Sequence, residues 1–163
     1  MSKATLCWWN DLPDATARLA ALVEQAAAAG RIKRRVNKAT GKPAASPCPS
    51  QFGWHLAVRV FERLVWHANH KQGLLVWVGP DTLAKYLGCE PDTAASVLAW
   101  WHRVGLLDDS GLRGRAGNKK RVLRLDLLGY AGTVYRPTVG GDISGQGGEI
   151  SQHRGGDIHP RTK

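Results

Sequence analysis

The sequence is poor in several features that would assign it to particular classes of protein. It has only 3 cysteines, at positions 7, 48 and 89, and none belongs to a C-x-x-C pair. We therefore expect no disulfide framework, and we predict that the protein works in a reducing compartment. No apolar run approaches the roughly 18 residues that cross a bilayer. The N-terminal residues also lack the charged start and apolar centre of a signal peptide. We expect a cytoplasmic protein without a membrane partner.

Acidic residues are scarce as well. The 163 residues include 13 Asp and Glu against 23 Lys and Arg, which gives a formal net charge of +10. Such an excess predicts a polyanionic partner, and nucleic acid is the first candidate, before anionic membranes and acidic proteins. The apolar fraction of 43% is ordinary, and the 19 glycines have no three-residue period. These values favour one compact domain with tails over a fibrous or wholly disordered chain.

Patterns that would indicate an enzyme are missing too. His67 and His70 lie three residues apart, but no Asp, Glu or Cys stands nearby at a matching position. The sequence contains no phosphate-binding glycine motif and no recognisable nucleophile and base arrangement. We therefore predict that the chain is not an enzyme and uses no metal or cofactor.

The composition changes three times along the chain and predicts four segments. Residues 1–30 predict a helical N-terminal arm with Leu19 and Leu22 on one face, ending at Gly30. Residues 31–50 predict a basic, proline-rich linker, and residues 51–130 predict the packed domain. Residues 131–163 are too rich in glycine and too poor in apolar residues to offset their ordering entropy, so they predict a flexible tail.

The tail contains a short internal repeat. GGDIS at 140–144 recurs as GGEIS at 147–151 and as GGDIH at 155–159. Spacings of seven and eight residues are too short for a stacked solenoid unit. The repeat is either duplicated sequence in a flexible tail, or it offers Ile143, Ile150 and Ile158 as three weak docking points for a protein partner.

Residues 79–127 carry the most informative pattern, which predicts two helices, a turn and a hairpin. Asp81 or Thr82 is expected to cap a short helix that Gly88 ends. A second helix is expected over residues 91–104, from Pro91 to the residue before Gly105. Residues 51–72 predict a further amphipathic helix, and residues 74–78 predict a strand.

These residues resemble the winged helix-turn-helix DNA-binding superfamily, of the bacterial regulator or the plasmid and phage replication type. The resemblance rests on Leu83-Ala84 with Leu87-Gly88, on Gly105-Leu106-Leu107, and on the basic hairpin that follows. It covers residues 51–128 and implies a mostly α fold with a small β-wing. The implied order of elements is helix, strand, helix, helix, strand, wing, strand.

The resemblance implies that helix 91–104 enters the major groove of DNA and that the wing follows the backbone or an adjacent minor groove. The residues of the recognition helix implied to contact DNA are Thr93, Ala95, Ser96, Trp100 and Arg103. The implied contacts of the wing are Arg113, Arg115, Lys119, Lys120 and Arg121, in a hairpin loop. The basic linker adds backbone contacts through Arg31, Lys33, Arg34, Arg35 and Lys38.

Two neighbouring tryptophans in that helix cannot face the same way, because successive residues differ by about 100°. We expect Trp101 to point into the core, in register with Val97 and Val104. Trp100 is then peripheral, either packed on the preceding helix or stacked at an interface. The outward face has no Asn or Gln and only one Arg, so direct base readout is expected to be modest.

Three functions follow from this pattern. The first is a sequence-preferring transcriptional regulator bound to double-stranded DNA in the nucleoid, as a homodimer that pairs through Leu19, Leu22 and Ala26. The second is a plasmid or phage replication protein that holds an origin. The third, of another class, is a protein-interaction scaffold whose charge binds an acidic partner.

Overall fold

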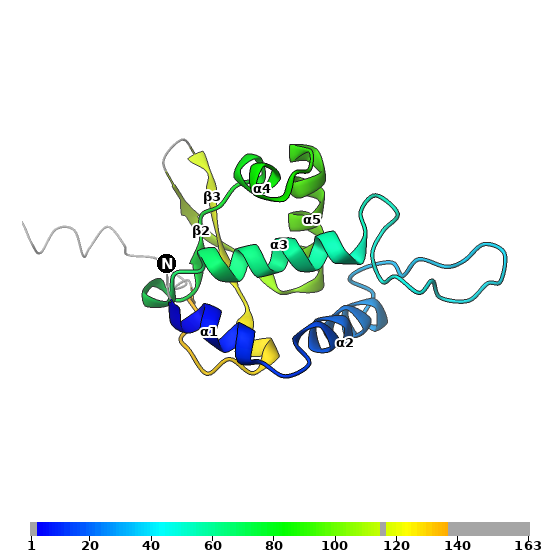
Figure 1. The fold of residues 1–163 in the computed structure, drawn as a ribbon, viewed down its shortest axis with the longest axis horizontal. Helices are drawn as coiled ribbons and strands as arrows, with labels where there is room; N and C mark the ends of the chain where they lie inside the picture. The colour runs from blue at the N-terminus through cyan, green and yellow to red at the C-terminus, as the bar shows by residue number, and fades with distance from the viewer. Residues whose placement is uncertain (1–2, 115–116, 137–163) are drawn as a thin grey trace, which may run out of the picture.

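The computed structural model describes residues 3–114 and 117–136 (Figure 1). Five α-helices and a small antiparallel sheet make up this part of the chain. The elements are α1 Lys3–Asp11, α2 Ala15–Ala28, α3 Trp54–His67, η1 His70–Gln72, β1 Leu75–Val76, α4 Pro80–Leu87, α5 Pro91–Val104, β2 Leu107–Arg113, β3 Lys119–Leu123 and η3 Leu125–Leu128. From α3 to β3 this is the order expected from the sequence. No helix in the described residues is long and apolar enough to span a bilayer.

Helices α3 and α5 form the centre of the hydrophobic core. The apolar stripe of α3 includes Ala57, Phe61 and Leu64, none of which is exposed. Phe61 packs on the Trp101 ring of α5, with the ring centroids 5.3 Å apart. The Trp101 indole Nε1 also donates a hydrogen bond of 3.0 Å to the Ala57 carbonyl oxygen. This bond satisfies the polar end of a fully buried tryptophan, and it fixes α5 against α3.

Helix α5 has the bounds predicted from the sequence, and glycines end α4 and α5 as expected. Gly88 and Gly105 have φ values of 65° and 98°, in the left-handed region that favours glycine. The start of α4 differs from the prediction. Gly79 is the N-cap and Pro80 is the first helical residue, so neither Asp81 nor Thr82 caps the helix. Proline fits that first position because its missing N–H has no partner there in any helix.

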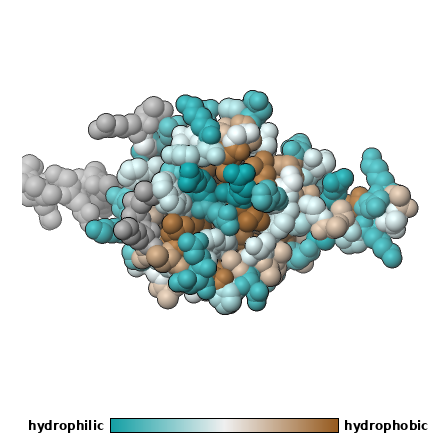
Figure 2. Space-filling model, viewed as in Figure 1, coloured by the Kyte–Doolittle hydropathy of each residue, from teal (hydrophilic) through white to brown (hydrophobic). Residues whose placement is uncertain are grey.

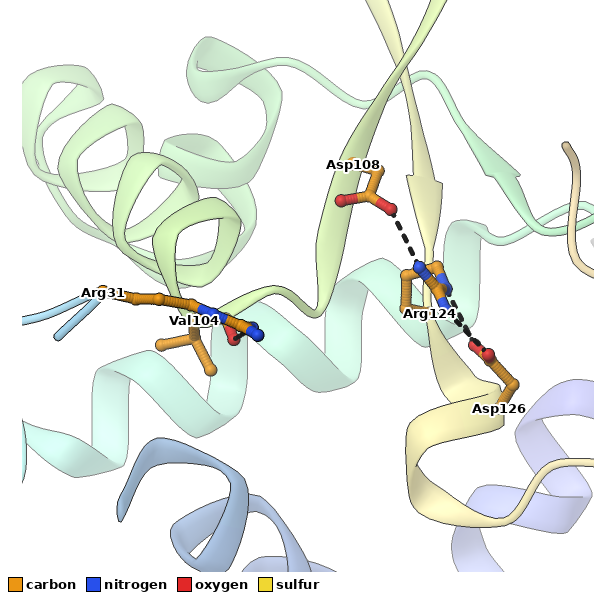
Figure 3. A network of polar contacts seen from close by, with 5 residues as sticks. All are labelled: Arg31, Val104, Asp108, Arg124 and Asp126. Atoms are coloured by element: carbon orange, nitrogen blue, oxygen red, sulfur yellow. Dashed lines mark hydrogen bonds and ion pairs between the residues drawn. The ribbon is translucent and has the colours of Figure 1, made fainter. Parts of the chain in front are cut away.

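The sheet has the strand order β1-β3-β2, with both pairs antiparallel. The predicted strand 74–78 is reduced to Leu75–Val76. Arg124 ties the base of the β2–β3 hairpin to η3: its guanidinium donates to Asp108 at 3.1 Å and to Asp126 at 2.9 Å (Figure 3). This network anchors the hairpin to the body of the protein.

The predicted N-terminal arm is not separate from the domain. Trp9 of α1 packs on Phe61 with ring centroids 5.3 Å apart, and Leu19 and Ala26 of α2 are buried in the same core as α5. Leu22 is half-buried against that core. The prediction that Leu19, Leu22 and Ala26 form a pairing surface is therefore wrong, because the chain itself covers this face.

The basic segment after α2 is only partly a linker. Val36 and Pro43 form an antiparallel bridge, and the Asn37 N–H donates to the Lys42 carbonyl oxygen at 2.8 Å. The loop closed by this bridge connects α2 to α3 and projects outward past both helices (Figure 1). The residues that follow return to the core, where Cys48 is buried.

Candidate nucleic-acid interface

One edge of α5 remains accessible and carries four of the five predicted recognition residues. Arg103 is exposed, and Thr93, Ala95 and Ser96 are half-buried. The Ser96 hydroxyl donates to the Asp92 carbonyl oxygen at 2.9 Å, one turn earlier. Its proton is therefore used within the helix, and its oxygen lone pairs stay free to accept. Apart from Arg103, the residues named on this edge have small side chains.

Trp100 does not belong to this edge. Its side chain is only 2% exposed and packs edge-on against Phe52, with ring centroids 5.8 Å apart. Trp101 is also buried, as expected, so both tryptophans lie in the core. The prediction placed Trp100 at the periphery because it assumed that the rest of the protein covers only one side of α5. Ile32 in the basic segment and Phe52 just after it are buried in the same core and extend it to the second side of α5.

A groove separates the exposed edge of α5 from the β2–β3 hairpin. It has a volume of about 400 Å³. Its lining residues are Pro80, Ala95, Leu98, Ala99, His102, Arg103, Asp109, Lys119 and Arg121. Helix and hairpin cations thus face one hollow, which we call the helix–hairpin groove.

The predicted hairpin cations are divided between two faces of the sheet. Lys119, Lys120 and Arg121 lie in strand β3 and not in the loop. Successive strand residues point to opposite faces, and Lys119 and Arg121 line the helix–hairpin groove. Lys120 instead lies over the exposed Trp77 ring, with its Nζ 4.3 Å from the ring centroid. The single five-cation loop expected from the sequence is therefore not formed.

The other two predicted cations of the hairpin lie near its tip. Arg113 ends β2, pairs in register with Lys119, and is exposed. Its guanidinium donates to the Gly117 carbonyl oxygen at 3.2 Å. Arg115 lies outside the described residues.

Burial in the helix–hairpin groove lowers the pKa of Arg121 from its ordinary value, and the nearby Asp109 carboxylate opposes this shift. Desolvation destabilises the charged form, so the guanidinium would gain from a further anion. Asp109 is also 3.9 Å from the Lys119 ammonium. Because that pair is exposed, its contribution to stability is small.

A second hollow, of about 350 Å³, continues the surface toward the basic segment. It is lined by Arg31, Ile32, Lys33, Pro49, Trp100 and Arg103. The Arg31 guanidinium donates to the Val104 carbonyl oxygen at 3.4 Å, at the C-terminal end of α5 (Figure 3). A cation at that end of a helix is favourable because the helix dipole is negative there.

Arg103 lines both hollows and so joins the basic segment to the hairpin. Together they form a run of cations that we call the cationic strip: Lys33, Arg31, Arg103, Arg121 and Lys119. His102 lies beside it and was missed by the sequence reasoning. Its position three residues after Ala99, which lies on the same face of the helix, could have indicated it.

The remaining predicted cations of the basic segment lie away from the strip. Arg34 forms an ion pair with Glu24 and donates to the Ala44 carbonyl oxygen at 3.1 Å, so it holds the segment to α2. Arg35 and Lys38 are exposed on or beside the projecting loop.

No group of three or more metal-ligating side chains occurs among residues 3–114 and 117–136. In comparisons with protein-family models, curated proteins and solved structures, none matched this chain.

Proposed function

We propose that this chain binds duplex DNA through the cationic strip and the exposed edge of α5, as winged-helix regulators of transcription do. The observation that carries the proposal is the position of Arg103, which lines both hollows and connects three basic elements into one surface. A continuous run of cations beside an exposed helix suits the spaced phosphates of a double helix.

The dimensions and chemistry of α5 suit the major groove. A helix with its side chains is about 10–12 Å wide, and the major groove is about 12 Å wide. Thr93 and Ser96 offer hydroxyl groups for hydrogen bonds with base edges, and Ala95 and Ala99 suit contact with thymine methyl groups. Lys119 and Arg121 would bind phosphates on one side, while Arg31 and Lys33 would do so on the other.

The first experiment selects bound fragments from a random duplex library and measures their affinity by fluorescence anisotropy over a range of salt concentrations. We expect binding that weakens steeply with salt, and enrichment of a preferred site. An inverted repeat in that site would support the predicted homodimer. Absence of duplex binding at low salt would rule out the proposed function.

A matched pair of double variants tests the strip itself. Lys119→Ala with Arg121→Ala removes two strip cations, and Lys71→Ala with Lys85→Ala removes two exposed cations elsewhere. Each lost phosphate contact should reduce the slope of log affinity against log salt by about 0.9. We expect a loss of nearly two in the first variant and almost none in the second. Equal slopes would show that only net charge matters.

Substitutions at the exposed edge of α5 should affect preference instead of overall affinity. Thr93→Ala and Ser96→Ala remove hydroxyl groups without changing charge. We expect each to alter the enriched sequence while leaving the salt slope unchanged, because base contacts specify and phosphate contacts position. Repeating the library selection with both variants measures this. An unchanged preferred site in both would place base readout elsewhere.

A further inference from the structure

A second groove lies on the opposite side of α3 from α5. Its volume is about 390 Å³, and its lining residues are Leu6, Trp9, Asn10, Arg59, Glu62, Arg63, Trp66, Tyr86 and Leu87. These residues come from α1, α3 and α4, and Figure 2 shows polar side chains over α3 with hydrophobic ones on either side. We call it the α1–α3–α4 groove. It is separated from the cationic strip by the core.

Arg63 lies over two aromatic rings in this groove. Its guanidinium carbon lies 4.6 Å from the Trp66 ring centroid and 3.8 Å from that of Tyr86. Stacking occupies the two flat faces of a guanidinium and leaves its in-plane N–H groups free to donate. Within the described residues, the Arg63 side chain forms no ion pair and donates no hydrogen bond. A half-buried, preorganised guanidinium of this kind is suited to a carboxylate, which it can bind with two parallel hydrogen bonds.

Apolar side chains border the stacked arginine. Leu6 and Trp9 of α1 and Leu87 of α4 line the same groove. A ligand that places an aliphatic group among them and a carboxylate against Arg63 would use both parts of the surface. The groove thus selects for an acidic residue next to an aliphatic one.

The tail of this chain contains that combination three times. The repeats at 140–144, 147–151 and 155–159 each place Asp or Glu directly before Ile. The described chain ends at Arg136, just after Tyr135, whose N–H donates to the Gly73 carbonyl oxygen at 2.6 Å. A few residues earlier, Tyr130 packs on Trp8 of α1, with ring centroids 4.9 Å apart. Residues 134–136 themselves line a hollow beside Asp108 and Arg124 at the base of the hairpin, so the repeats must reach the groove across the residues between.

The tail is also long enough. An extended chain covers at most about 3.5 Å per residue, so the second repeat, 11 residues beyond Arg136, can lie up to about 39 Å away. A domain of this size has a radius of gyration of about 14 Å, and the groove is within that reach.

We propose that the α1–α3–α4 groove binds the acidic–isoleucine repeats of the chain's own tail, with a repeat carboxylate on Arg63 and the following isoleucine beside Leu6 and Leu87. Tethering gives the repeats a high effective concentration at the groove, and three copies raise it further. A weak site would thus be filled within one molecule. This inference does not depend on DNA binding.

The test compares ¹H–¹⁵N spectra of the full chain without DNA. Arg63→Gln should shift the tail amide resonances of residues 140–158. A second variant, Asp142→Asn with Glu149→Gln and Asp157→Asn, leaves the groove intact and should shift the Trp66 indole resonance. The Trp101 indole resonance reports whether each variant keeps its fold. Shifts that are independent of protein concentration would show binding within one molecule.

A charge-matched control separates docking from general attraction between the repeat carboxylates and a basic protein. Arg103→Gln removes the same charge from an exposed position on the opposite side of the molecule. We expect it to leave the tail resonances unchanged. Equal effects of Arg103→Gln and Arg63→Gln would overturn the proposal, and so would tail resonances that neither variant moves. If neither variant moves the tail resonances, the groove would instead be a site for a partner other than this chain.

Discussion

At the scale of single residues, burial decides how the cysteine thiols react. Burial raises the pKa of Cys48 to about 11, against a hydrogen bond from Ser46 that lowers it, whereas Cys7 is exposed. At pH 8 the thiolate fraction of Cys48 is about a hundredfold below that of a thiol with a pKa of 9.0.

Cys7 should therefore be alkylated first in the native protein, and Cys48 only on unfolding. Mass spectrometry of iodoacetamide-treated protein, with and without denaturant, measures the order. Rapid native labelling of Cys48 would contradict its placement in the core.

His67 predicts a dependence of stability on pH. Burial lowers its pKa from the ordinary value of 6.5, and the positive charge of Arg63 adds to the shift. The unfolded chain therefore binds a proton more readily than the folded one. The free energy of unfolding should fall as the pH drops below 6.5, and level off for this group below its folded pKa.

Urea denaturation between pH 7.5 and 5.5 measures this slope. His67→Gln should flatten it, and His102→Gln, at an exposed position, should not. Identical slopes in all three proteins would contradict the shift.

At the scale of elements, two glycines with similar backbone angles should differ in their tolerance of a side chain. Gly73 and Gly88 have φ values of 69° and 65°. A Cβ at Gly88 meets no atom within 4 Å, but at Gly73 it would lie 2.5 Å from the backbone nitrogen of Tyr135.

Gly88→Ala should cost about 1–2 kcal/mol, which is the strain of a left-handed alanine. Gly73→Ala should cost more, because the segment at Tyr135 must move away from η1. Chemical denaturation gives both values. A similar cost at the two positions would show that this segment is held only loosely.

At the same scale, local signals in the sequence were sufficient for the bounds of α5 and for the end of α4. Proline near the start and glycine after the end define α5, because both act through the backbone of the residue itself. Helix α1 was not predicted as a separate element, because the nine residues Lys3–Asp11 are too few to show a sustained helical period. The division of the hairpin cations could have been predicted from strand alternation, had Lys119, Lys120 and Arg121 been assigned to a strand.

At the scale of the whole molecule, the N-terminal helices are part of the core. Leu19 is fully buried, and Leu127 is a large apolar residue with 44% exposure. Leu19→Ala should destabilise the protein by about 2–5 kcal/mol. Leu127→Ala should have little effect.

Denaturation and sedimentation velocity together test this. Neither variant should change the association state. A shift from dimer to monomer in Leu19→Ala, with stability retained, would instead restore the pairing surface expected from the sequence.

The burial of Trp100 was not predictable from helical periodicity, which describes only one element at a time. It depends on the positions of Ile32 and Phe52, both distant in sequence from α5. The candidate site shows the same limit. Its residue types were evident in the sequence, but the connection of hairpin and basic segment through Arg103 is a property of the tertiary structure.

Because β3 directs Lys119 and Arg121 to one side and Lys120 to the other, a single-codon insertion or deletion inside that strand would exchange their surroundings. Arg121 would be turned away from α5, and Lys120 would take its place in the hollow. Changes of two codons would preserve the arrangement. Natural variation in the length of β3 should therefore occur in even steps, and odd steps should be confined to the connection between β2 and β3.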